Sequence, residues 1–149
     1  YHHGVVDESG LLQGDAFEHG ILKDDIVITQ DTVRQLQLAK AAIRTGIELA
    51  AYELRLPLQE ISQVYLAGGF GFYLNPESAY CLGLLPEEFR GKLKIAGNTS
   101  LKGAVLALTE PERMLKLPEN MKNSKVMDLS LNKNFQEFFV HRLSFPPNH

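Results

Sequence analysis

The sequence lacks the residue types on which several classes of protein depend. It contains one cysteine, Cys81, and no tryptophan. A single thiol cannot close an internal disulfide, and it cannot alone ligate an iron–sulfur cluster or a zinc finger. The histidines show neither the i, i+4 spacing nor the partner carboxylates of a metal site; they are His2, His3, His19, His141 and His149. We therefore expect no metal or cluster bound by this chain itself.

Strong charge of one sign and long apolar runs are also missing. The net charge is -3, both signs are interspersed, and no predicted helix carries a basic stripe, which argues against nucleic acid as a partner. No apolar run approaches the roughly 18–20 residues that a membrane helix needs, and there is no signal peptide. The expected location is the cytoplasm, without a membrane partner.

The composition that is present is typical of a folded protein. The chain has 149 residues, of which 44% are hydrophobic and 22% charged, enough for one compact domain with a real core. It opens at Tyr1, with no initiator methionine and no clear first structural element. We expect a single domain over residues 1–149 that is a segment of a longer protein, with residues 1–28 as a connecting segment.

The clearest periodic pattern predicts a long helix from Thr29 to the residues before Pro57. Thr29 can cap the helix, and Asp31 suits its first turn. One apolar stripe recurs at helical spacing for about seven turns. Its members are Val33, Leu36, Ala39, Ile43, Ile47, Ala50 and Leu54.

Short apolar runs alternate with further helices in the rest of the chain. Residues 64–67 and 93–96 read as buried strands, and residues 125–129 as a third strand. Helices are expected after Asn75, after Asn98, from Pro111 and over residues 132–142. This alternation predicts an α/β fold with a small, mostly parallel sheet flanked by helices.

The junction after the first of these strands could bind a ligand. Gly68, Gly69, Phe70 and Gly71 follow the strand directly. At the carboxyl end of a strand in an α/β sheet, glycines let the backbone approach a phosphate or a nucleoside closely. On the glycines alone, a tight turn that needs positive φ is the preferred explanation, because a single glycine-rich turn is a weak signal for a ligand. The spacing does not match a dinucleotide-binding loop, because position 74 is leucine, and no Gly-Lys-Ser/Thr of a P-loop is present.

A polar edge lies on the long helix. Gln37, Lys40 and Arg44 share one face, and Lys40 falls at the margin of the apolar stripe, so its amine must reach solvent or meet an acceptor. The edge is either a solvated surface or a contact for a ligand with ring acceptors and phosphates. The sequence shows no Ser/His/Asp arrangement and no pair of carboxylates that stands out as general acid and base.

Seven short segments of the sequence, taken together in their order and spacing, resemble one protein family. They are ITQD at 28–31, LQLAKAAIRTGI at 36–47, VYLAGGFG at 64–71, NPESA at 75–79, GLLP at 83–86, GNT at 97–99 and FQ-x-x-FV at 135–140. The chain resembles the C-terminal part of the reductive activators of corrinoid iron–sulfur proteins and corrinoid methyltransferases. Members of that family are similar to actin, sugar kinases and Hsp70, which have a three-layer, ribonuclease H-like ATPase fold.

The resemblance implies a nucleotide site shared with a longer parent protein. The turn from Gly68 to Gly71 looks like the adenosine motif of the superfamily, and Gln37, Lys40 and Arg44 would border the adenine, so residues 29–149 would be the adenosine-side subdomain. The hairpins that hold the phosphates and Mg²⁺ in the superfamily have no match here, and neither does the cysteine-rich iron–sulfur domain. The parent would use ATP with Mg²⁺ and act on a corrinoid protein, whereas this chain alone would bind nucleotide weakly and hydrolyse nothing.

Two other functions remain open from the sequence. The same superfamily includes small-molecule kinases and activators of acyl-CoA dehydratases, and the chain could be a subdomain of one of these. Alternatively, it could be a non-enzymatic docking or dimerisation module, for example in a homodimer, that uses the apolar surface left exposed by the absent lobe.

Overall fold

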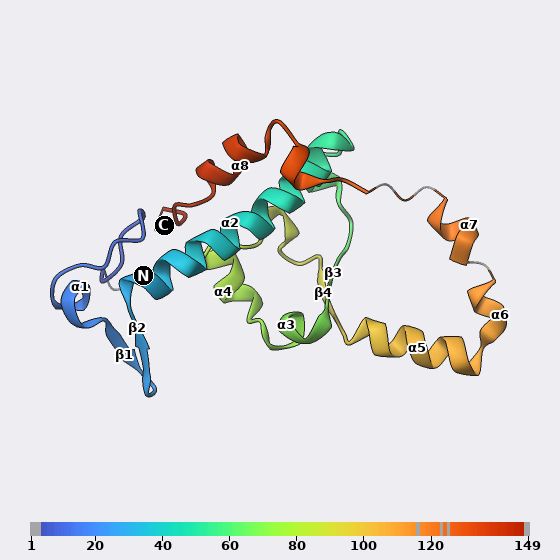
Figure 1. Ribbon diagram of the computed structural model, residues 1–149, viewed down its shortest axis with the longest axis horizontal. Helices are drawn as coiled ribbons and strands as arrows, with labels where there is room; N and C mark the ends of the chain where they lie inside the picture. The colour runs from blue at the N-terminus through green and yellow to red at the C-terminus, as the bar shows by residue number, and fades with distance from the viewer. Residues whose placement is uncertain (1–3, 116, 123, 125, 148–149) are drawn as a thin grey trace.

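The computed structural model describes residues 4–115, 117–122, 124 and 126–147 (Figure 1). Its helices are α1 (Asp15–His19), α2 (Gln30–Glu53), α3 (Gly68–Tyr73), α4 (Pro76–Cys81), α5 (Thr99–Thr109), α6 (Pro111–Met114), α7 (Leu117–Met121) and α8 (Phe135–His141). The strands are β1 (Ile21–Lys23), β2 (Ile26–Ile28), β3 (Val64–Ala67) and β4 (Leu93–Gly97). Short 3₁₀ turns are η1 (Leu58–Glu60), η2 (Glu87–Phe89) and η3 (Leu129–Leu131). Within this part of the chain, no helix is long and apolar enough to cross a membrane.

Helix α2 begins where the sequence predicts it. The Thr29 hydroxyl accepts a hydrogen bond from the Thr32 amide at 3.3 Å, and the Thr32 hydroxyl accepts one from the Thr29 amide at 3.4 Å. This reciprocal capping satisfies two amides that the first helical turn leaves without partners. The helix ends before Arg55, which has a φ of 52°, and Pro57 follows.

The strands form two pairs in the described chain. Strands β3 and β4 are parallel, with Val64 opposite Leu93 and Ala67 opposite Gly97, as residues 64–67 and 93–96 predict. The predicted α/β fold with a small parallel sheet flanked by helices is confirmed. Strands β1 and β2 form an antiparallel hairpin instead, so the predicted connecting segment contains regular structure.

The predicted strand over residues 125–129 is wrong for its described part. Lys125 lies outside the described residues, and residues 126–128 form no strand. The Asp128 carboxylate accepts hydrogen bonds from the Ser130 amide at 2.9 Å and the Ser130 hydroxyl at 2.6 Å. Such a local contact favours a turn over an extended strand, and η3 begins at the next residue.

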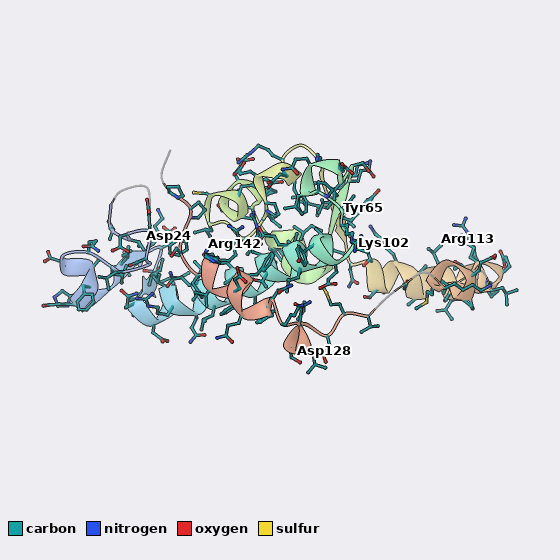
Figure 2. The ribbon with its side chains drawn as sticks, turned by 90° about the horizontal axis from the view of Figure 1, so that it is seen from above. Asp24, Tyr65, Lys102, Arg113, Asp128 and Arg142 are labelled. Carbon is teal, nitrogen blue, oxygen red and sulfur yellow. The ribbon has the colours of Figure 1, made fainter. Side chains whose placement is uncertain are left out.

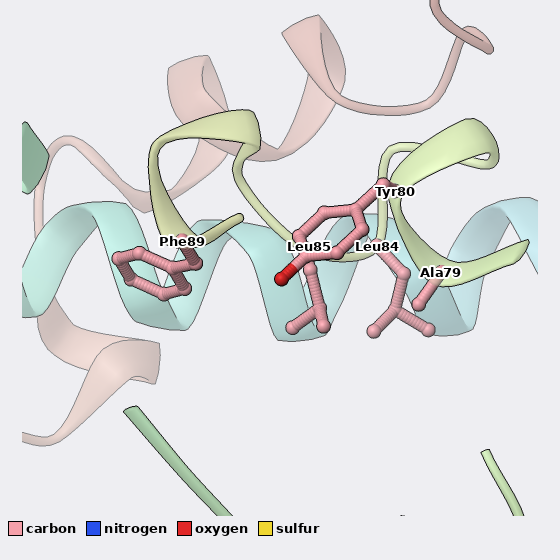
Figure 3. Packing of buried hydrophobic residues seen from close by; sticks show 5 residues of the cluster. All are labelled: Ala79, Tyr80, Leu84, Leu85 and Phe89. Atoms are coloured by element: carbon pink, nitrogen blue, oxygen red, sulfur yellow. The ribbon is translucent and has the colours of Figure 1, made fainter. Parts of the chain in front are cut away.

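The first hydrophobic core packs the segment between α4 and β4 against α2 (Figure 3). Its buried members are Ala79, Tyr80, Leu84, Leu85 and Phe89. Half-buried neighbours from α2 and the sheet complete it, among them Ile47, Val64 and Leu93. This core fixes α4 and the parallel pair to the same side of α2.

A second core joins the two ends of the described chain. Val6 and Leu12 from the N-terminal segment pack with Val33 of α2 and with Phe145. The Phe145 amide also donates to the Glu8 carbonyl at 2.8 Å. Residues 142–147, hereafter the C-terminal segment, therefore lie against both α2 and the N-terminal segment.

The buried face of α2 differs from the predicted apolar stripe. Leu36, Ile43 and Leu54 are exposed, whereas Gln37 and Lys40 are buried. Val33 and Ile47 of the stripe do pack into the two cores. The stripe is wrong elsewhere because polar side chains can be buried when acceptors meet them, and here the C-terminal segment supplies main-chain carbonyls.

Helices α5 to α7 extend away from the other elements (Figure 1). No residue of α5 is buried, and the Leu108 side chain is 85% exposed. Leu49, on α2, is instead fully enclosed at 0% exposure.

This contrast predicts different costs for the same truncation. Leu49→Ala should lower the free energy of unfolding by about 2–5 kcal/mol, because it removes buried methyl groups and leaves a cavity. Leu108→Ala should change it by less than about 0.5 kcal/mol. Urea unfolding followed by circular dichroism measures both, and equal losses would contradict the assignment of the core.

Candidate functional site

The glycine turn lies at the carboxyl end of β3, where it begins α3. Gly68 has a φ of 86°, which favours glycine, and a Cβ built on Gly71 would stand 2.7 Å from the Leu66 side chain. A Cβ on Gly69 would meet no atom within 4 Å. Gly69 is therefore required neither by its backbone angles nor by packing, and its backbone faces open space. The predicted Phe70 belongs to α3, but its side chain lies outside the described residues.

A second glycine turn lies beside it. Strand β4 pairs in parallel with β3 and ends at Gly97, which has a φ of 68°. The next residue, Asn98, caps α5 by accepting a hydrogen bond from the Leu101 amide at 2.9 Å. Two turns with positive φ thus share one edge of the sheet, the edge at which α/β folds bind ligands.

The polar edge of α2 holds the C-terminal segment. The Gln37 side-chain amide donates to the carbonyls of Ser9 at 2.9 Å and Leu143 at 3.0 Å. The Lys40 amine donates to the carbonyls of Arg142 at 2.7 Å and Ser144 at 2.6 Å. The same amine lies 5.1 Å from the centre of the Phe145 ring. The Lys40 side chain thus meets acceptors rather than solvent.

Arg44, the third residue of the predicted edge, belongs to a charged triad. Glu48 accepts a hydrogen bond from Arg44 Nε at 2.6 Å on one oxygen and from Arg142 Nε at 2.9 Å on the other. The Glu48 side chain is only 8% exposed. Two arginines from distant parts of the chain therefore share one buried carboxylate.

A cavity of about 580 Å³ opens between α2, the segment after α4 and the C-terminal segment. The residues that line it are Lys40, Arg44, Tyr80, Cys81, Gly83, Leu85, Glu87, Glu88, His141, Arg142, Ser144, Phe145, Pro146 and Pro147. Lys40 and Arg44 are among them, whereas Gly68, Gly69 and Gly71 are not. The predicted site residues therefore form two groups, one at the sheet edge and one at this cavity.

Sequence reasoning missed Glu48, Tyr80 and Arg142. The i, i+4 spacing of Arg44 and Glu48 predicts an ion pair and could have identified Glu48. Arg142 is 94 residues from Glu48, and no local pattern predicts that contact. In the described chain, no group of three or more His, Cys, Asp or Glu side chains could hold a metal ion.

Burial lowers the pKa of Lys40 from its ordinary value of 10.5 to about 8, and the charges of Arg142 and Arg44 add to this effect. The neutral amine retains two N–H groups, enough for the two carbonyls that it contacts. Loss of the proton therefore need not break these hydrogen bonds.

This pKa predicts a rise in stability with pH. Below about pH 8 Lys40 is charged in both states, so the folded state bears the cost of burying the charge. Between about pH 8 and 10.5 the unfolded state holds the proton that the folded state has lost, so the free energy of unfolding increases, by about 3 kcal/mol in all.

The measurement compares the wild type with Lys40→Met and with Lys133→Met at an exposed lysine, by urea unfolding from pH 7 to 10.5. The wild type and the Lys133 variant should share a rise that the Lys40 variant lacks. Parallel curves for all three would contradict the low pKa.

Comparisons with known proteins agree with this fold. The sequence model of the family described as the C-terminal domain of RACo, the ASKHA domain, matches residues 10–149. A solved structure of a reductive activator for corrinoid, iron–sulfur protein superposes with a TM-score of 0.83 at 32% identity, and covers 98% of this chain and 26% of that one.

Two curated relatives carry related names. The corrinoid activation enzyme RamQ of Eubacterium limosum is 39% identical over 88 residues, which are 59% of this chain and 15% of that protein. The Co(II) methylated amine-specific corrinoid protein reductase of Methanosarcina barkeri is 28% identical over 127 residues, 84% of this chain and 23% of that protein. The chain spans about a quarter or less of the length of these relatives. The family match over residues 10–149 nevertheless covers nearly the whole chain, which therefore belongs to the family of RACo C-terminal, ASKHA-type domains.

Proposed function

We propose that the chain forms the adenosine-binding wall of an ATP site in a longer reductive activator of corrinoid proteins. The observation that carries the proposal is the sheet edge where Gly68 and Gly69 lie beside Gly97. In this proposal, residues 29–149 are the adenosine-side subdomain and residues 1–28 connect it to the rest of the protein.

The residues at this edge fit a nucleoside. Added Cβ atoms at Gly68 and Gly69 would meet nothing within 4 Å, so the backbone is open to close approach by a flat ring or a ribose. Gly71 packs on Leu66 and holds α3 close to β3. The proposed wall also includes Phe70, whose main chain belongs to α3.

The other three residues fit less directly. The donors of Gln37 and Lys40 are already taken by main-chain carbonyls, and both side chains are buried. We therefore assign them an indirect part in the proposed site, in which they hold the C-terminal segment on α2. Within the described residues Arg44 donates only its Nε, to Glu48, and it lines the cavity, so any direct contact between α2 and the nucleotide would come from its terminal nitrogens.

The names of the relatives favour a corrinoid protein as partner over the substrate of a kinase or a dehydratase. They are a corrinoid activation enzyme, a corrinoid protein reductase and an activator for a corrinoid, iron–sulfur protein. In the proposed parent, ATP with Mg²⁺ supplies free energy for closure of the protein around its partner during one-electron reduction of Co(II) corrinoid. The electron would come from an iron–sulfur cluster in another domain, and this chain contributes nucleotide contacts only.

The test is Gly69→Val in the intact protein that carries this chain. A valine side chain would enter the open space in front of Gly69, so the protein should fold normally while the nucleoside loses its place. The dissociation constant for ATP, measured by titration calorimetry, should rise at least about tenfold.

The matched control is Gly103→Val, a helical glycine of α5 that also has nothing within 4 Å of its Cβ position. It should leave ATP binding unchanged. A folded Gly69 variant that binds ATP like the wild type would remove the sheet edge from the nucleotide site.

A further inference from the structure

Helix α5 carries an apolar face that the described chain leaves open. Four apolar side chains recur at the i, i+3, i+4, i+7 spacing that places them on one side of a helix; they are Leu101, Ala104, Val105 and Leu108, hereafter the α5 stripe. The side chains of Leu101, Val105 and Leu108 are 61%, 50% and 85% exposed. The contacts of α5 within the described chain are mainly with α6, the helix that follows it. Figures 1 and 2 show, from two directions, that both helices stand away from the rest of the chain.

Helix α7 extends this apolar surface. Leu117 and Met121 lie one turn apart on α7 and are 40% and 63% exposed. Leu115, between α6 and α7, is 81% exposed. An apolar surface that continues over three successive helices is typical of a contact with another part of a protein.

A helix of this length needs packing to be stable. Helix α5 has 11 residues, and isolated helices shorter than about 12–15 residues are marginal in water. None of its residues is buried, so packing within the described chain stabilises it little. We therefore expect the stability of α5 to come from a surface outside the described chain.

The composition of α5 indicates what kind of surface this is. Lys102 is its one charged residue, and the Lys102 amine donates to the Ala96 carbonyl at 2.7 Å, at the end of β4. Helices that lie on membranes carry many Lys and Arg residues on their polar side, and α5 does not. Contacts with transient partners are about as polar as the rest of a protein surface, whereas permanent contacts resemble the core of a domain. The composition of α5 therefore fits a permanent contact with an apolar protein surface.

The length of the solved relative indicates where such a surface lies. The matched part covers 98% of this chain, so the few residues left out are too few to be α5. The same part is only 26% of the relative, so most of that protein lies outside it. A surface on the same polypeptide is always at hand, which suits a permanent contact better than a partner that must be met by diffusion.

We infer that the α5 stripe docks in an apolar groove on the part of the longer protein that lies outside this chain, with the exposed side chains of α7 covered beside it. Apolar grooves receive a helix through side chains at the i, i+3, i+4 and i+7 positions, which are those of the stripe. The inference depends on the longer protein of the proposed function, but not on its nucleotide site.

The first experiment identifies what lies against the stripe in the intact protein. The photo-crosslinking residue p-benzoylphenylalanine takes the place of Leu108, and the product is analysed by gel electrophoresis and peptide mapping. The cross-link should form within one polypeptide and join position 108 to a residue outside this chain. It should form with no other protein added.

The second experiment measures the protection of α5 by hydrogen exchange of the intact protein, followed by mass spectrometry. Peptides from α5 should exchange at least about a hundredfold slower than the unfolded sequence. Leu108→Asp should raise their exchange at least about tenfold, because it places a charge in the groove. The control Gly103→Asp adds the same charge on the opposite side of α5, where a Cβ meets nothing within 4 Å, and should leave the exchange unchanged.

A milder variant decides the matter if Leu108→Asp does not fold. Leu108→Ala removes only the groups that fill the groove, and it should raise the exchange of α5 by roughly threefold in the intact protein. In Gly69→Val, α5 should keep its protection whether or not that variant binds ATP. Failure of the nucleotide site and failure of this inference are therefore distinguishable.

Three results would overturn the inference. Rapid exchange throughout α5 in the intact protein means that no surface covers the stripe. A cross-linked product of twice the mass of the polypeptide means that a second copy covers it. A cross-link or protection that appears only when a corrinoid protein is added means that the stripe belongs to the contact with that partner.

Discussion

The buried amine of Lys40 is the contact on which the arrangement of this chain depends. It donates to two carbonyls of the C-terminal segment and lies over the Phe145 ring, while Gln37 binds a third carbonyl one turn earlier on α2. Because Phe145 also belongs to the second core, the same contacts fix the N-terminal segment. Burying a charge is costly unless acceptors surround it, which explains why the C-terminal segment presents its carbonyls to α2.

The division between what the sequence could predict and what it could not follows the range of the interactions. The caps at Thr29, Asn75 and Asn98 act over three residues, so the starts of α2, α4 and α5 were predictable. The acceptors of Lys40 lie more than 100 residues away, and no local pattern indicates them. The apolar periodicity of α2 therefore identified the helix correctly but only part of its buried face, with Val33 and Ile47 in the cores and Leu36 and Ile43 exposed.

The candidate site shows the same division. Positive φ at Gly68 and its position after β3 follow from the residues themselves, because a strand followed by glycines is a local signal. The position of this turn relative to the edge of α2 depends instead on long-range packing, in which α4 and the parallel strands meet α2 in the first core. The proposed nucleotide wall and the cavity beside α2 are consequently different places, and the C-terminal segment lines only the cavity.

The most direct test of this account is native-state hydrogen exchange at the Phe145 amide, which donates to the Glu8 carbonyl at 2.8 Å. In Lys40→Met the C-terminal segment should detach from α2, so this amide should exchange at least about tenfold faster while amides of the first core keep their wild-type rates. Equal exchange at Phe145 in the two proteins would mean that Lys40 does not hold the segment, and the account would be contradicted.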